Sequence, residues 1–203
     1  MSWFKPHLDK SLELILKLGL QKNAKIIDVG SGASTLPDDL LAEGFKNITV
    51  LDISSEALKV SKDRLGSRAK QICWLEADVT QAPMKPGCYD LWHDRALFHF
   101  LADNDDRKKY VERLKRSLKP EGHAIISTFS LKGPLKCSGL DIVRYSPETL
   151  QAELGKGFHF VETVEEEHPT PSGMTQSFVY CHFKKAAARQ DRGKGFPARR
   201  ERQ

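Results

Sequence analysis

The sequence contains no long hydrophobic run. Nowhere in its 203 residues do roughly 18 to 20 apolar residues follow one another, the length that a helix needs to cross a bilayer. The first twenty residues place apolar side chains at helical intervals, with charged ones such as Asp9 and Glu13 between them. This pattern lacks the unbroken apolar core and the cleavage site of a secretory signal. We therefore expect no membrane span and a cytoplasmic location.

Cysteine is also scarce. The four cysteines are scattered, with no C-x-x-C pair and no histidine at ligand spacing: Cys73, Cys88, Cys137 and Cys181. A disulfide framework needs paired cysteines and an oxidising compartment, and a structural zinc site needs clustered ligands. The sequence therefore predicts reduced thiols and no bound metal.

A basic excess is absent from most of the chain. The net charge is +5, from 32 Lys and Arg against 27 Asp and Glu, but residues 184–203 hold eight of the basic residues and two of the acidic ones. Residues 1–183 therefore carry 24 basic and 25 acidic residues, a net charge of −1. We expect one folded domain over residues 1–183 and a disordered basic tail over 184–203, which solubilises the protein or binds a polyanion weakly. A nucleic-acid partner is not expected.

Segments with strand and helix patterns alternate along the chain. The expected strands cover residues 25–29, 47–51, 72–76, 89–93, 123–128, 159–164 and 177–183. The expected helices cover residues 8–18, 36–43, 56–65 and 105–118, and a further helix opens at Ser146. Such alternation is typical of a mostly parallel sheet covered by helices. It predicts an α/β fold, a Rossmann-like three-layer sandwich with a seven-strand sheet and an antiparallel C-terminal strand.

A glycine turn follows the first expected strand. The run Lys25–Val29 includes the acidic residue Asp28 and leads into Gly30-Ser31-Gly32, just before a helix. The two glycines allow a sharp turn and a close approach of the backbone to a ligand, because no Cβ stands in the way. Ordinary turns and phosphate-binding loops use the same pattern, so the turn alone does not identify a ligand.

Acidic residues also follow the second and third expected strands. Asp52, with Ile53 after it, lies 24 residues beyond Asp28, where a nucleotide ribose needs a carboxylate to accept its hydroxyl protons. Asp78, followed by Val79, comes just after the third strand. Ligands of open α/β sheets bind at the carboxyl ends of the strands, so three acidic strand ends together predict a nucleotide-like ligand. They do not distinguish S-adenosylmethionine (SAM) from NAD.

The order of these motifs resembles the class I SAM-dependent methyltransferases. D-V-G-S-G-A-S, L-D-I-S and A-D-V follow one another as they do in that family, and the resemblance extends over residues 20–183. It implies that SAM is the cofactor and S-adenosylhomocysteine the product. The cofactor-binding residues that it implies are Asp28, Gly30, Ser31, Gly32, Asp52, Ile53, Asp78, Val79 and His93. One departure is that Ser34 and Thr35 stand where dinucleotide-binding loops have a third glycine, which argues against NAD.

The segment after the fourth expected strand is dense in histidine, aromatic and ionic residues. Its D-R-x-x-[LF] pattern, which runs from Asp94 to Phe98 and is followed by D-R-x-x-Y from Asp106, resembles the thiopurine methyltransferase group, which methylates small thiols. The same segment is similar to a group of protein lysine methyltransferases. His93 and Asp94 are the catalytic candidates, to remove a proton from the acceptor or to orient it. The alternatives are a structural histidine at the sheet edge and a local ion pair of Asp94 with Arg95.

Two further segments are candidates for covering the site. Residues 133–140 form a Gly- and Pro-containing loop after the fifth strand, where a lid with Lys136 and Cys137 is expected, or a plain surface crossover. Trp3 and Phe4 close over the cofactor or anchor the first helix.

The sequence leaves three functions open. The first is a SAM-dependent methyltransferase acting on a small molecule such as a thiol, an amine or a similar soft nucleophile. The second is a protein lysine methyltransferase. The third is a nucleotide-binding Rossmann protein that is not a methyltransferase. Neither the acceptor nor the oligomeric state follows from the sequence.

Overall fold

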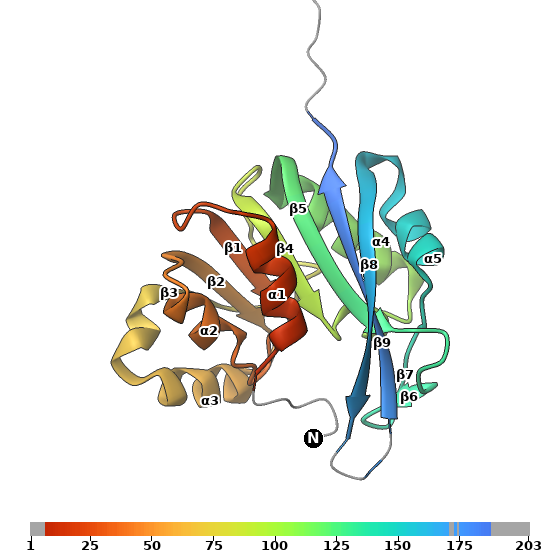
Figure 1. The fold of residues 1–203 in the computed structure, drawn as a ribbon, viewed down its shortest axis with the longest axis horizontal. Coiled ribbons are helices and arrows are strands. Elements are labelled where there is room, and N and C mark those ends of the chain that lie inside the picture. Colours follow the sequence, from red (N-terminus) through yellow and green to blue (C-terminus); the bar gives the residue numbers. More distant parts are fainter. Residues whose placement is uncertain (1–6, 171–172, 174, 188–203) are drawn as a thin grey trace, which may run out of the picture.

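The computed structural model describes residues 7–170, 173 and 175–187, which form a seven-strand sheet with helices on both faces (Figure 1). The sheet consists of β1 (Lys25–Val29), β2 (Asn47–Asp52), β3 (Ile72–Glu76), β4 (Tyr89–Arg95), β5 (Leu118–Phe129), β8 (Phe158–Pro169) and β9 (Thr175–Lys185). The helices are α1 (Asp9–Lys17), α2 (Leu36–Ala42), α3 (Ser55–Leu65), α4 (Asn104–Ser117) and α5 (Pro147–Leu154). Short 3-10 turns η1 (Gly66–Gln71), η2 (Phe98–Phe100) and η3 (Gly155–Gly157), and a small hairpin of β6 (Lys136–Cys137) and β7 (Leu140–Asp141), complete the fold.

The strand order is β3-β2-β1-β4-β5-β9-β8. Strands β1 to β5 are parallel to one another, whereas β9 is antiparallel to both β5 and β8. The predicted α/β fold with an antiparallel C-terminal strand is therefore confirmed. The chain reverses the direction in which it adds strands between β1 and β4, and open sheets bind ligands at such a point, at the carboxyl ends of the strands.

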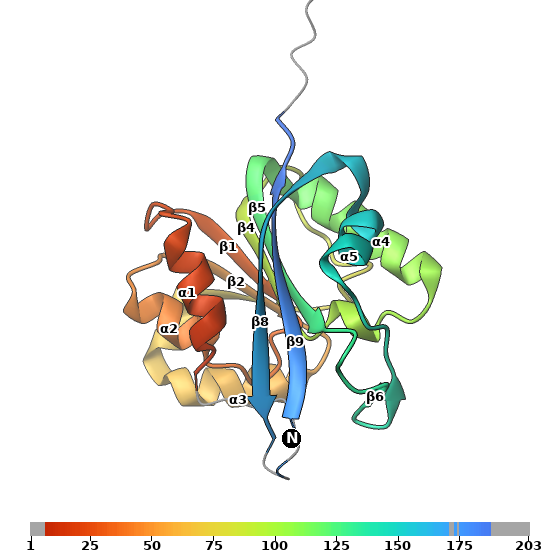
Figure 2. The ribbon, with the colours of Figure 1, turned by 45° about the vertical axis from the view of Figure 1, so that its right-hand side comes forward.

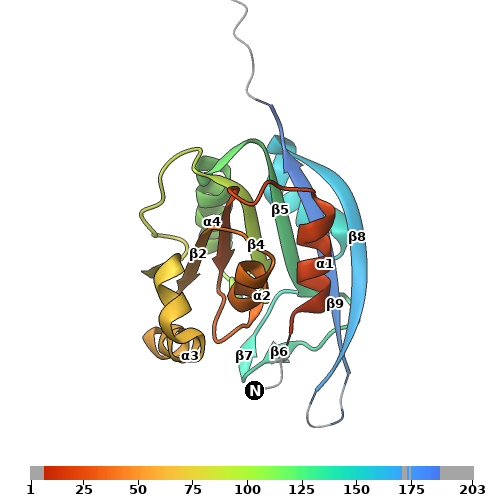
Figure 3. The ribbon, with the colours of Figure 1, turned by 60° about the vertical axis from the view of Figure 1, so that its left-hand side comes forward.

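Alternating side chains of the central strands face two separate cores. Ile26 and Leu91 pack with α1, α2 and α3, whereas their neighbours Ile27 and Trp92 pack with α4 and α5. Figure 2 shows the same division, with α1 and α2 on one side of the sheet and α4 and α5 on the other, and in Figure 3 α2 lies in front of the sheet and α4 behind it. Successive residues of a strand point to opposite faces, so a strand covered on both sides must be apolar at nearly every position.

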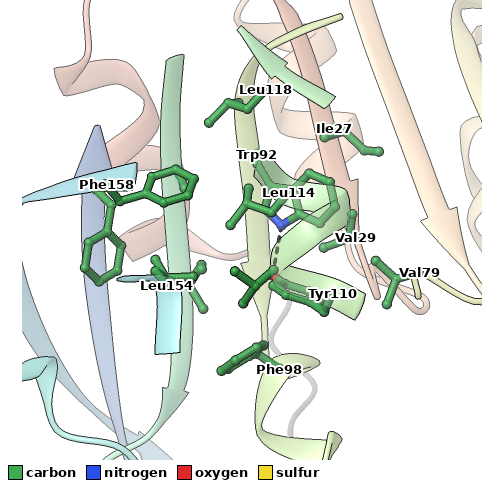
Figure 4. Packing of buried hydrophobic residues seen from close by; sticks show 14 of the residues in the cluster. Ile27, Val29, Val79, Trp92, Phe98, Tyr110, Leu114, Leu118, Leu154 and Phe158 are labelled. Carbon is green, nitrogen blue, oxygen red and sulfur yellow. Dashed lines mark hydrogen bonds between the residues drawn. The ribbon is translucent and has the colours of Figure 1, made fainter. Parts of the chain in front are cut away.

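The core beneath α4 contains a polar contact between two large aromatic side chains. The Trp92 indole N–H donates a hydrogen bond to the Tyr110 hydroxyl over 2.9 Å, and the two rings meet edge to face with centroids 5.5 Å apart (Figure 4). Both residues are fully buried. A buried indole or phenol needs such a partner, and this pair holds α4 at a fixed height against β4.

The last two strands are longer than predicted. Strand β8 covers 158–169 instead of 159–164. Its last residues pair with the part of β9 that lies beyond the pairing of β9 with β5, from Glu167↔Ser177 to Pro169↔Thr175. This part of the hairpin extends past the rest of the sheet (Figure 1). It follows on from the run Glu165-Glu166-Glu167, in which the apolar alternation of a half-buried strand is lost, so the pattern gave no sign that the strand continues.

The helix that was expected to open at Ser146 does begin there. The Ser146 hydroxyl accepts a hydrogen bond from the Thr149 backbone N–H, the Thr149 hydroxyl accepts one from the Ser146 N–H, and Pro147 occupies the first turn. Among residues 7–170, 173 and 175–187, no helix is long and apolar enough to cross a membrane. Trp3, Phe4 and residues 188–203 of the expected tail lie outside the described residues, so the predictions for them stay predictions.

Candidate functional site

A cavity of about 580 Å³ lies at the carboxyl ends of β1, β2 and β4. Its size is within the range of sites that hold a cofactor-sized ligand. It is lined by Asp28, Gly30, Ser31 and Gly32 at the end of β1, by Asp52 and Ile53 at the end of β2, and by His93, Arg95, Ala96 and Leu97 at the end of β4. The structure thus brings together seven of the nine predicted cofactor residues in one cavity. The other two, Asp78 and Val79, line a smaller neighbouring one.

The glycine turn is in close contact with the turn that follows β4. Gly30 has φ +63°, and a Cβ at this position would lie 2.3 Å from the Leu97 Cδ1 and 2.6 Å from the Leu97 Cβ. A side chain here would be strained by the backbone conformation and would also collide with the root of the Leu97 side chain. The requirement for glycine therefore comes from the protein itself, in addition to any ligand.

Asp52 connects the end of β2 to the glycine turn. Its Oδ2 accepts a hydrogen bond from the Gly32 N–H over 2.7 Å, and its Oδ1 accepts one from the Ser54 N–H over 2.8 Å. A carboxylate has about four acceptor positions, so two remain for a ligand. Ile53 beside it is 73% exposed, an unusual position for a large apolar residue, and it lines the cavity.

Asp78 and Val79 lie in a second cavity of about 90 Å³, which shares Asp52, Ile53 and Leu97 with the first. Burial by itself would raise the pKa of the Asp78 carboxyl. Hydrogen bonds from the backbone N–H and the hydroxyl of Thr80 outweigh the effect of burial, so the pKa is lowered. The carboxylate is therefore ionised at neutral pH and acts as an acceptor.

His93 lies between Asp28 and a serine of the first helix. Its Nδ1 is 2.6 Å from the Asp28 Oδ1, and its Nε2 is 2.9 Å from the Ser11 Oγ. All three side chains are buried. The other carboxylate oxygen, Asp28 Oδ2, is buried without a hydrogen-bond partner among the described residues. An unpaired buried carboxylate oxygen is costly, so this geometry favours a ligand with a positive hydrogen-bond donor.

Asp94 points away from the cavity, into the core beneath α4. Its Oδ2 accepts a hydrogen bond from the Tyr110 hydroxyl over 2.6 Å, and its Oδ1 accepts one from the Leu97 N–H over 3.0 Å. Burial raises the pKa of this carboxyl to about 6 although these bonds lower it. His93 and Asp94 are neighbours in a strand and so face opposite sides of the sheet. Of the two catalytic candidates, only His93 lines the cavity.

Arg95 lines the cavity, and side chains of β8 and β9 hold its guanidinium group in place. Its Nε donates a hydrogen bond to the Tyr180 hydroxyl over 3.0 Å, Tyr180 donates one to Glu166 over 2.9 Å, and the guanidinium lies over the Phe178 ring. The expected local ion pair with Asp94 is not what holds Arg95, because Asp94 lies on the opposite face. The sequence motif pointed to Arg95, but gave no sign of partners that are 71 to 85 residues away.

Much of the rest of the cavity wall is apolar. Leu8 before α1, Phe100 of η2, Phe129 at the end of β5, and Cys137 and Leu140 of the β6–β7 hairpin contribute to it, whereas Ser34 and, at the start of α3, Ser54 and Glu56 add polar groups. This hairpin belongs to the loop that was expected to cover the site, and it lies at the same end of the sheet as the start of α1 (Figure 3). Lys136 instead pairs with Asp141 on the exposed side, and Arg144 donates hydrogen bonds to the carbonyls of Leu131 and Gly133.

Comparisons with known proteins agree on the type of domain. Residues 27–126, just under half of the chain, match the family profile described as a methyltransferase domain. The human EEF1A lysine methyltransferase 2 is 25% identical over 176 residues, which cover 83% of this chain and 67% of the human protein. The bovine eEF1A lysine and N-terminal methyltransferase is 25% identical over 123 residues, which cover 61% of this chain and only 17% of the bovine protein.

A solved structure shows the same fold. It is that of Burkholderia thailandensis 1,6-didemethyltoxoflavin-N1-methyltransferase, with bound 1,6-didemethyltoxoflavin and S-adenosylhomocysteine. The two chains superpose with a TM-score of 0.69 at 19% sequence identity, over 88% of this chain and 77% of the other. The profile and the relatives confirm the prediction of a methyltransferase domain, and the solved structure confirms the fold. The specific resemblance to thiopurine methyltransferases and the cytoplasmic location stay predictions.

The contact between the glycine turn and Leu97 predicts the effect of adding one methyl group. We expect Gly30→Ala to destabilise the protein by at least about 2 kcal/mol more than Gly44→Ala, because overpacking is added to backbone strain. Gly44 is the matched control: its φ is +86°, but nothing lies within 4 Å of a Cβ there. Urea unfolding of both variants measures the difference, and equal losses would show that Leu97 moves aside freely.

The burial of the Asp94 carboxyl predicts that removing its charge stabilises the protein more at neutral pH than at acidic pH. The folded protein holds the proton up to about pH 6, whereas the unfolded chain releases it near pH 4, so the stability that Asp94 contributes falls as the pH rises through this window. We expect the stability of Asp94→Asn relative to wild type to rise by about 2 to 3 kcal/mol between pH 4 and pH 7. Urea unfolding at both pH values tests this, and a constant difference would contradict it.

Proposed function

We propose that this protein, through its SAM-dependent methyltransferase domain, methylates the side-chain amine of a lysine in another protein. The observation that carries the proposal is the cavity of about 580 Å³, in which polar cofactor-type residues and an apolar wall meet around Arg95 and Leu97. The names of the bovine and human relatives support lysine as the acceptor. A small thiol or amine is the alternative acceptor.

The residues of the cavity fit SAM. The unpartnered Asp28 Oδ2 suits the ammonium group of its methionine part, and the backbone of the Gly30–Gly32 turn lines the cavity beside it. Asp52 would hold the ribose hydroxyls through its two remaining acceptor positions. The adenine would lie between Ile53 and Val79, with Asp78 accepting from its amino group. SAM supplies a methyl group on a sulfonium, which the acceptor attacks in line.

The apolar wall of the cavity supports an amine acceptor on a long aliphatic stem. Leu8, Phe129 and Leu140 can enclose the four methylenes of a lysine, and they exclude water from its end. An amine must be neutral to attack, and an apolar environment lowers the pKa of an ammonium because burial disfavours its charge. Both nitrogens of His93 already have partners, so the desolvated cavity wall, rather than His93, would promote loss of the proton.

Cofactor binding is the first test. We expect calorimetric titration to detect binding of SAM and S-adenosylhomocysteine but not of NAD, and Asp52→Ala to weaken the binding at least about tenfold, the effect of losing hydrogen bonds to a charged group. Asp90→Ala is the matched control, because Asp90 also accepts from a backbone N–H in this sheet but lies at the amino ends of the strands. Binding of NAD, or of neither sulfur compound, would overturn the proposal.

Transfer of labelled methyl groups identifies the acceptor. We expect protein extracts incubated with the enzyme and labelled SAM to yield labelled methyl-lysine after acid hydrolysis, because the cavity suits a lysine side chain. Asp52→Ala supplies the negative control, since it should lose the cofactor. Label found only in small thiols or amines would exclude a protein acceptor and would show that the acceptor is a small molecule.

A further inference from the structure

We propose that Ser11 and His93 are positioning residues that hold the Asp28 carboxylate for the ammonium group of the cofactor, and that they thereby couple the docking of α1 to cofactor recognition. This inference rests on the proposed function, because it concerns the same cavity. It adds a residue from the first helix, Ser11, that neither the motifs nor the comparisons indicate.

His93 fixes the orientation of the Asp28 carboxylate. A carboxylate at the end of a strand can rotate, but the Asp28 Oδ1 is held by the His93 Nδ1 at 2.6 Å. The Nδ1 therefore carries the proton of the ring, since a carboxylate only accepts. With Oδ1 occupied, Oδ2 is the oxygen left for the ligand, and it is buried without a partner among residues 7–170, 173 and 175–187.

Ser11 in turn fixes the orientation of the His93 ring. Its Nε2 lies 2.9 Å from the Ser11 Oγ, and both side chains are fully buried. With the proton on Nδ1, the Nε2 of a neutral ring accepts the hydrogen of the Ser11 hydroxyl. The imidazole is thus fixed at both ends, and the chain of bonds runs from α1 through β4 to β1.

Helix α1 connects the Ser11 hydrogen bond to the wall of the cavity. Leu8, which precedes the helix, lines the cavity, and Ser11 lies one turn further on. The helix also contributes Leu14 and Ile15 to the core on the same face of the sheet. A ligand cation at the Asp28 Oδ2 strengthens the carboxylate's preference for one orientation, and the bonds through His93 transmit that preference to Ser11. Binding and helix docking are then reciprocal.

Two related ligands separate positioning from simple support of the fold. S-adenosylhomocysteine carries the amino acid group, whereas 5′-methylthioadenosine has the same nucleoside without an ammonium. We expect Ser11→Ala to weaken binding of S-adenosylhomocysteine about tenfold or more and to change binding of 5′-methylthioadenosine less than about twofold. A helix that is merely loosened would weaken both ligands alike, and this result would overturn the inference.

His93→Asn provides a second, conservative break in the same chain. The Asn amide can still donate to Asp28 from the position of Nδ1, but it is too short to reach Ser11. We expect this variant to show the same selective loss as Ser11→Ala, and the double variant to be no weaker than either single one, because both remove one link. Additive losses would contradict a single chain of bonds.

Ser117→Ala is the matched control. Ser117 is also a fully buried helical serine with one hydrogen bond, to the Arg113 carbonyl in α4, and it does not line the cavity. It should leave the affinities for both ligands unchanged. If the wild type binds neither ligand, the proposed function itself fails. If it binds both and Ser11→Ala changes neither affinity, only the positioning role is lost.

Hydrogen exchange of the wild-type protein tests the coupling without any variant. We expect S-adenosylhomocysteine to slow exchange of the α1 amides more than 5′-methylthioadenosine does, with both ligands at saturation. Equal protection of α1 by the two ligands would show that the ammonium group does not act on the helix, and would overturn the coupling.

Discussion

The buried carboxylate of Asp94 fixes the turn after β4, and the shape of the cavity depends on that turn. Its two oxygens accept from Tyr110 on one side and from the backbone of Leu97 and Phe98 on the other. They hold a sharp bend in which Ala96 has the positive φ of +68°. The bend brings Leu97 against Gly30 and places it in the walls of both cavities. A charge inside the core thus determines the distance between the glycine turn and the β4 turn.

The two faces of strand β4, which precedes that turn, line different parts of the protein. His93 and Arg95 face the cavity, where each is held by partners from distant parts of the chain. Trp92 and Asp94 face the core beneath α4, where Tyr110 contacts both. Because successive residues point to opposite faces, a substitution on one face affects the side chains on the other face only through the backbone. The dense polar segment that stood out in the sequence is therefore two separate networks.

The sequence was sufficient to predict the order of the fold's elements and the meeting of the candidate cofactor residues at one edge of the sheet. Asp28, Asp52 and Asp78 each come at the end of a parallel strand, and such ends meet at one edge of the sheet, so their proximity follows from the pattern alone. The partners of His93 and Arg95 did not follow. Ser11 is 82 residues from His93, and nothing distinguishes it from an ordinary helical serine. The roles of His93 and Asp94 differ because of strand alternation, which the motif does not reveal unless the register is known.

The far part of the β8–β9 hairpin has a consequence for how the molecule behaves at high concentration. Strand β8 is the outermost strand, so one side of its backbone has no partner strand within the described chain. An open edge of this length is a template on which a second sheet can grow. The run Glu165-Glu166-Glu167 lies on it, and Glu165 and Glu167 are exposed. Two such edges brought together would oppose rows of like charge, so the acidic run protects the protein against edge-to-edge aggregation.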